Sequence, residues 1–162
     1  MFKVNKMKSN KSGFTLIEVV LVLAIGGLIF LLAFLAFGQA TKNRRDTQRR
    51  SDGARVVSEI ENSKGDSGGS SFSSAATLGA FAQDYLGGTS SPTGGSFTSN
   101  NITYTFNYGT SVPGTAVTSS TGYLTTQQNT KCSGNTLTTG SGNGDYGVLV
   151  KLEKGVACRD NQ

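Results

Sequence analysis

One acidic side chain stands at the edge of a membrane-length apolar segment. Glu18 is followed by twenty residues, Val19 to Gly38, that carry no charged or polar side chain. As a helix these residues span about 30 Å, the thickness of the hydrocarbon core of a bilayer. An acid costs about 2.5–3.5 kcal/mol even at mid-bilayer. Fourteen Val, Leu, Ile and Phe side chains, at roughly 0.3–0.6 kcal/mol each, exceed that cost. We therefore expect insertion, and a partner that neutralises the carboxylate.

The residue types that support most catalysis are missing or too sparse. The sequence contains no histidine, which excludes histidine-based acid–base catalysis and histidine metal ligation. Asp145 and Glu153 are too few for a calcium site, which needs six or more oxygen ligands. No nucleophile can be matched with a base. We therefore predict that the protein is not an enzyme and has no cofactor and no metal site.

The two cysteines, Cys132 and Cys158, both lie in the C-terminal part of the chain. If this part is outside the cytoplasmic membrane, its compartment permits a disulfide. Such a bond would stabilise the fold by about 3 kcal/mol in the chain-entropy account. The alternative is two unpaired thiols, although cysteines outside the cytoplasm usually pair.

The run Gly13-Phe14-Thr15-Leu16-Ile17-Glu18 follows a short lysine-rich leader and opens the apolar segment. In this order the residues resemble the processing site of type IV pilins and pseudopilins. The resemblance implies that a prepilin peptidase of the membrane cuts after Gly13 and methylates the new N-terminus at Phe14. It also implies that Glu18 pairs with the N-terminal ammonium of a neighbouring subunit during assembly.

The resemblance covers residues 11 to about 62 well and the remaining chain in outline. Many type IV pilins carry a disulfide near the C-terminus, which agrees with the positions of Cys132 and Cys158. Many also carry a proline where this chain has Leu35, eight residues after Gly27. The helix-melting step associated with that proline is therefore not expected in the same form here.

The net charge of +5 belongs largely to the leader. Four lysines precede Gly13, and their removal leaves +1. The remaining positive charge is concentrated in residues 39–55, with a net of +4. A helix touching anionic headgroups is one use of this stretch, and weak nucleic-acid binding is another. We favour pairing between subunits of a filament, with four possible acceptors: Asp46, Asp52, Glu59 and Glu61.

The pattern along the chain predicts four regions. Residues 1–13 form a leader that is cleaved, and residues 14–38 form the transmembrane or filament-core helix. Residues 39–64 form the distal, basic half of the same helix, and residues 65–162 form a Gly/Ser/Thr-rich head with a C-terminal disulfide loop. The helix is expected from Phe14 to Asn62, with Gly65 beyond its last turn. Its apolar stripe of Val56, Val57 and Ile60 is expected to contact the head.

Within the head, residues 75–86 are predicted to form a short amphipathic helix that ends at Gly87-Gly88. Residues 89–101 are read as turns, because they hold a proline and a glycine pair. Strict alternation predicts a strand over residues 102–108. Two further strands are expected over residues 122–127 and 146–153, the second turning back into residues 156–158. The fold class is α+β: a long N-terminal helix whose C-terminal half packs on a small antiparallel sheet, the arrangement of pilins.

These observations favour a structural subunit of a type IV pilus-like filament. Its expected partners are further copies of itself in a helical filament, the prepilin peptidase, a membrane assembly platform and membrane lipid. It would be a single-pass cytoplasmic membrane protein before assembly and part of an extracellular filament afterwards. Small residues on the apolar helix would permit close packing of neighbouring helices, namely Gly26, Gly27, Ala33, Ala36 and Ala40.

Two other functions stay open. One is a pseudopilin of a type II secretion or DNA-uptake system. The other is a secreted or single-pass anchored domain unrelated to filaments, because Ala36-Phe37-Gly38 resembles a signal-peptidase site and would give a mature chain that starts at Gln39. Signal h-regions are usually about 7–15 residues long, which disfavours the secreted form.

Overall fold

The computed structural model describes residues 13–67, 72–140, 142 and 144–161. Residues 1–12 of the expected leader lie outside this range. The chain divides into an N-terminal unit, Met1–Ala40, and a C-terminal unit, Thr41–Gln162. Helix α1, Leu16–Asp66, contributes to both units.

Helix α1 is bounded differently from the sequence expectation. It begins at Leu16 rather than Phe14, because Thr15 and Glu18 hydrogen-bond across its first turn. It ends at Asp66 rather than Asn62, so Gly65 lies inside the helix. Contacts to the rest of the C-terminal unit support the added turn: Lys64 Nζ donates a 2.8 Å hydrogen bond to the carbonyl of Gly144. Tertiary packing here outweighs the helix-breaking preference of glycine.

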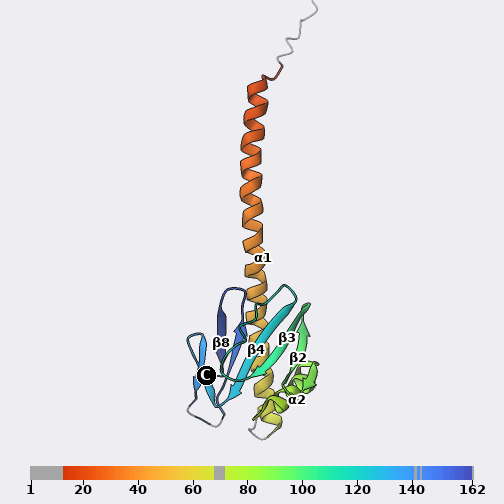
Figure 1. The fold of residues 1–162 in the computed structure, drawn as a ribbon, viewed down its shortest axis with the longest axis vertical. Helices are drawn as coiled ribbons and strands as arrows, with labels where there is room; N and C mark the ends of the chain where they lie inside the picture. The colour runs from red at the N-terminus through yellow and green to blue at the C-terminus, as the bar shows by residue number, and fades with distance from the viewer. Residues whose placement is uncertain (1–12, 68–71, 141, 143, 162) are drawn as a thin grey trace, which may run out of the picture. The chain divides into compact units, whose positions relative to one another are not determined.

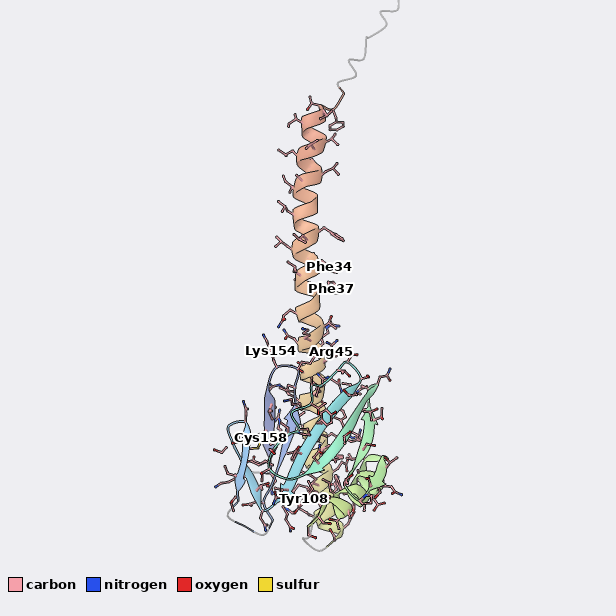
Figure 2. All side chains as sticks on the ribbon, viewed as in Figure 1. Phe34, Phe37, Arg45, Tyr108, Lys154 and Cys158 are labelled. Carbon is pink, nitrogen blue, oxygen red and sulfur yellow. A yellow bond between two sulfur atoms is a disulfide. The ribbon has the colours of Figure 1, made fainter. Side chains whose placement is uncertain are left out.

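The N-terminal unit is the apolar part of α1. Its large side chains are exposed, and Figure 2 shows Phe34 and Phe37 projecting from the helix surface, at 72% and 77% exposure. Among the described residues, α1 is the one helix long and apolar enough to cross a membrane, with a mean hydropathy of 3.0 over its most apolar window.

The C-terminal unit is built on a six-stranded sheet in the order β1-β2-β3-β4-β7-β8 (Figure 1). The strands are β1 Thr89–Ser91, β2 Gly94–Ser99, β3 Ile102–Tyr108, β4 Thr121–Gln128, β7 Tyr146–Lys151 and β8 Val156–Asp160. Strands β5 Thr130–Ser133 and β6 Thr136–Thr139 form a separate hairpin. The long helix packs on this small sheet, which confirms the α+β class.

All neighbouring strands are antiparallel except β3 and β4, which are parallel. The expected sheet was antiparallel throughout, so this pair is a difference. Parallel neighbours need a long crossover rather than a tight turn, and residues 109–120 supply it. The alternation over residues 102–108 is confirmed, with Ile102, Tyr104 and Phe106 buried and Tyr108 half-buried.

The prediction of turns over residues 89–101 was wrong, because most of these residues form strands β1 and β2, which pair with each other and with β3. Helix α2, Ala75–Leu86, packs on these strands so closely that a Cβ at Gly79 would lie 1.9 Å from the Gly94 carbonyl oxygen. The glycines therefore serve a helix–sheet contact rather than a loop. Helix α2 itself has the expected bounds, with Ser74 as N-cap and Gly87 as C-cap.

The core lies between α1, α2 and one face of the sheet. Val56 and Ile60 of α1 are fully buried in it and Val57 is partly buried, as the apolar stripe predicted. Aromatic rings fill the space near α2, with Phe81 edge-on to Phe106 at 6.3 Å between centroids. Gly53 lets the helix approach β7, because a Cβ there would lie 2.4 Å from Val150 Cγ2.

Candidate processing and assembly site

The expected cleavage position lies just before α1. Gly13 precedes the helix, and a Cβ added to it would meet no atom within 4 Å. Phe14 is 89% exposed. A peptidase can reach an extended, uncovered bond more readily than one inside a helix, because cleavage needs an open backbone. The described geometry at Gly13 and Phe14 is therefore compatible with cutting at this bond.

Glu18 caps the first turn of α1. Its Oε2 atom accepts a 2.9 Å hydrogen bond from the backbone N–H of Thr15 and a 2.7 Å bond from the Thr15 hydroxyl. The first contact is one half of a capping box, in which an acid in the first turn satisfies a free N–H of the helix start. The carboxylate also lies where the helix dipole favours negative charge.

The cap uses one of the two carboxylate oxygens. Within the described residues, Oε1 of Glu18 has no hydrogen-bond partner, and the side chain is exposed. A carboxylate can accept about four hydrogen bonds. The observed cap therefore leaves room for a cationic partner at the same side chain.

The apolar part of α1 offers an uncovered surface for packing. Between Leu16 and Phe37 its large apolar side chains are 49–83% exposed. Gly26, Gly27 and Gly38 have open space at the Cβ position. An exposed apolar surface of this extent marks a contact with lipid or with another protein. It fits the membrane anchor of a precursor.

Some of the basic side chains of residues 39–55 form contacts inside the C-terminal unit. Arg49 is fully buried, and its Nη1 atom lies 3.0 Å from Asp46 and 3.3 Å from Glu153. Its Nη2 atom donates to the Thr118 carbonyl at 2.5 Å. Arg45 binds both carboxylate oxygens of Glu153. These contacts hold the β7–β8 turn and the 109–120 crossover against α1.

The arginine contacts also change the ionisation of Glu153. Hydrogen bonding from Arg45 holds the pKa of the Glu153 carboxyl below its ordinary value. The backbone N–H of Glu153 in turn donates to Asp46 Oδ1 at 2.9 Å. Figure 2 shows Arg45 and Lys154, the neighbour of Glu153, at the same end of the C-terminal unit, with Tyr108 at the other end.

A buried acid, Asp52, lies about one helix turn beyond Arg49. Asp52 is 4% exposed and accepts hydrogen bonds from Tyr104 at 2.6 Å, from Ser99 at 2.9 Å and from Gln48 at 3.1 Å. Burial, followed by the bond to Asp52, raises the pKa of Tyr104 well above its ordinary value, so its hydroxyl stays a donor.

Asp46 and Asp52 were expected as possible acceptors for a neighbouring subunit. Both carboxylates have partners within the chain, and Asp52 is buried at 4% exposure, so a neighbouring subunit does not reach Asp52. The i,i+3 spacing of Asp46 and Arg49 was readable in the sequence as a helical pair. The contacts of Arg49 with Glu153 and of Asp52 with Tyr104 were not readable, because each joins residues more than fifty positions apart.

Cys132 and Cys158 form a disulfide, with 5.7 Å between their Cα atoms. It ties the β5–β6 hairpin to β8, and the label of Cys158 in Figure 2 marks its place beside that hairpin. Leu137 of the hairpin packs against the sheet at Gly147. Among the described residues, no group of three or more Cys, Asp or Glu side chains is placed to hold a metal ion.

Comparison with known proteins adds one finding. Residues 8–34 match the family model of the prokaryotic N-terminal methylation motif. No curated protein and no solved structure matches the chain. The matched segment contains Gly13, Phe14, Glu18 and most of the apolar helix. This N-terminal segment, residues 8–34, is thus similar to the class III signal peptide found in type IV pilins and pseudopilins.

Proposed function

We propose that this protein is a structural subunit of a type IV pilus-like filament. A prepilin peptidase removes the leader after Gly13 and methylates the new amino group of Phe14. The mature chain is held in the cytoplasmic membrane by Val19–Gly38 until an assembly platform transfers it to the filament. The filament then lies outside the cell.

The proposal rests on two features that occur together at the start of α1. A matched methylation motif covers residues 8–34, and the helix that follows has an uncovered apolar surface. In a filament, neighbouring helices cover that surface, and their association depends on close packing and polar pairs. Membrane lipid covers it before assembly.

Glu18 has a defined role in this assembly. Cleavage creates an ammonium group on Phe14, and a neighbouring subunit offset along the filament axis brings that group to the carboxylate. The unused Oε1 atom supports this pairing, because the cap by Thr15 can remain in place. Within an apolar environment, the attraction between the carboxylate and the ammonium offsets part of the cost of desolvating them.

The experiment is the isolation of filaments sheared from cells that produce the protein. The proposal expects this chain in the sheared fraction and along the filament by immunogold electron microscopy. A deletion strain should lack those filaments. Filaments that persist unchanged, together with a chain that stays in the membrane fraction, would favour the pseudopilin alternative, in which the polymer is confined to the envelope.

A further inference from the structure

Three arginines of the basic stretch have no role inside the subunit. Arg44, Arg50 and Arg55 are exposed. Within the described part of the chain, their guanidinium groups form no hydrogen bond and no ion pair, whereas Arg45 and Arg49 form several. We call the surface that carries Arg44 and Arg55 the basic face. A positive surface without internal partners is available to an external one.

The basic face is shaped to receive a partner. A shallow hollow runs along α1 and is lined by Asn43, Arg44, Thr47, Gln48 and Ser51. Arg44 and Arg55 are eleven residues apart, close to three full turns, so they project from the same side of the helix. That side has hydrogen-bonding side chains between the two charges, which suits a polar protein surface.

The other end of the C-terminal unit carries the opposite charge. Asp66, the last residue of α1, and Asp84 of α2 are both exposed. They line one groove between the two helices, together with Ser63, Thr77 and Tyr85. Tyr85 donates a 2.9 Å hydrogen bond to Asp66, which fixes that carboxylate in the groove. We call this surface the acidic end.

We infer that the basic face of one subunit binds the acidic end of a second copy of the chain. The two surfaces are different, so the contact is heterologous, and a heterologous contact that does not close on itself produces an open helical filament. Asp66 lies about 16 Å beyond Arg55 along α1, so the contact requires copies displaced along the helix. The inference rests on the proposed function and names the surfaces that join its subunits.

Two other anionic partners, a lipid surface and a nucleic acid, would explain only one of the two charged surfaces. Anionic lipid headgroups and the phosphates of nucleic acid could each bind the basic face, but either ligand leaves the acidic end without a function. A second copy uses both surfaces.

The test uses charge reversal in the full-length protein in its host. One variant carries Arg44→Glu and Arg55→Glu, and the other carries Asp66→Arg and Asp84→Arg. Each is expected to lower the yield of sheared filaments about tenfold or more, because like charges across an interface cost several kcal/mol and 1.4 kcal/mol is a factor of ten. Arg159→Glu is the matched control, since Arg159 is exposed on β8 outside both surfaces. Membrane levels and disulfide formation of every variant confirm that it is made and folded.

The decisive arm is co-expression of the two defective variants. Each reversed surface then meets its complement on the other variant, and the inference predicts alternating subunits and filament yield within about threefold of wild type. Failure of this rescue, or normal filaments from both variants, overturns the inference alone. Normal filaments with lost retention of DNA, or of phosphatidylglycerol vesicles, assign the basic face to that ligand instead. A wild-type chain that forms no polymer overturns the proposed function as well.

Discussion

The hydroxyl of Tyr104, on strand β3, donates a 2.6 Å hydrogen bond to the buried carboxylate of Asp52, on helix α1. The two residues are 52 positions apart in the sequence. The bond joins the long helix to the sheet, and it explains how a charged side chain is tolerated in this core. Ser99 and Gln48 supply the other donors.

Replacing Tyr104 with Phe removes the hydroxyl and preserves the ring, which stacks on Phe97. We expect a loss of about 1.5–3 kcal/mol in the free energy of unfolding, the range for a hydrogen bond to a charged group. Thermal unfolding of the detergent-solubilised protein measures it. Tyr123→Phe is the control, because the Tyr123 hydroxyl has no partner among the described residues, and it should change stability by less than about 0.5 kcal/mol. Equal effects of the two variants would contradict the assigned role.

Two glycines of α1 should respond oppositely to the same substitution. Gly53→Ala places a Cβ 2.4 Å from Val150 Cγ2, so overpacking should destabilise the fold by about 1–3 kcal/mol. Gly65→Ala meets nothing within 4 Å and should stabilise it by about 0.5–1 kcal/mol through helix propensity. Denaturant unfolding of both variants tests this. A stabilising Gly53→Ala would refute the close packing of α1 on β7.

Acid should weaken the fold partly through Glu153. Its pKa is lowered in the folded state, chiefly by the hydrogen bond from Arg45, so the folded state binds this proton less readily than the unfolded state. The contribution to stability is therefore complete above the ordinary value of 4.5 and is lost as the pH falls through the lowered pKa.

Glu153→Gln should lower the melting temperature at neutral pH and flatten its decline below about pH 5. Melting curves across this pH range provide the measurement. Glu59→Gln serves as the control, because the Glu59 side chain accepts only from Asn62 in the described residues. If Glu153→Gln kept the wild-type acid dependence, the ion pairs with Arg45 and Arg49 would not contribute to stability.

Glu18→Gln separates capping from charge. The amide oxygen of glutamine can still accept the Thr15 N–H, so the helix start and membrane insertion should be preserved. Without the negative charge, the Phe14 ammonium of a neighbour loses its partner, and filament yield should fall at least about tenfold. Comparison of membrane and sheared fractions by immunoblot gives both quantities, with Glu59→Gln treated in parallel. If Glu18→Gln gave a wild-type filament yield, the negative charge of Glu18 would have no role in assembly.

Local sequence patterns were sufficient to predict the elements whose formation depends on residues close together in the sequence. Alternation along residues 102–108 identified β3, and the boundaries of α2 followed from its apolar face and Gly87. The apolar segment and the residues around Gly13 identified the N-terminal motif. Each of these features depends on residues within a few positions of one another.

Features that depend on long-range packing were missed. Gly94 and Gly95 suggested a turn, but α2 packs on them and they lie in β2. The parallel pairing of β3 and β4 depends on the path of residues 109–120. The complete burial of Arg49 was also unexpected, because charged side chains are rarely buried without partners, and its partners at Glu153 and Thr118 are distant in sequence.

The mass of the N-terminal peptide of the mature protein tests the central claim most directly. Protein purified from sheared filaments and digested with a protease should give a peptide that begins at Phe14 and carries one added methyl group. An N-terminus at Met1, or at Gln39, would contradict the account, because the amine that neutralises Glu18 would then not exist.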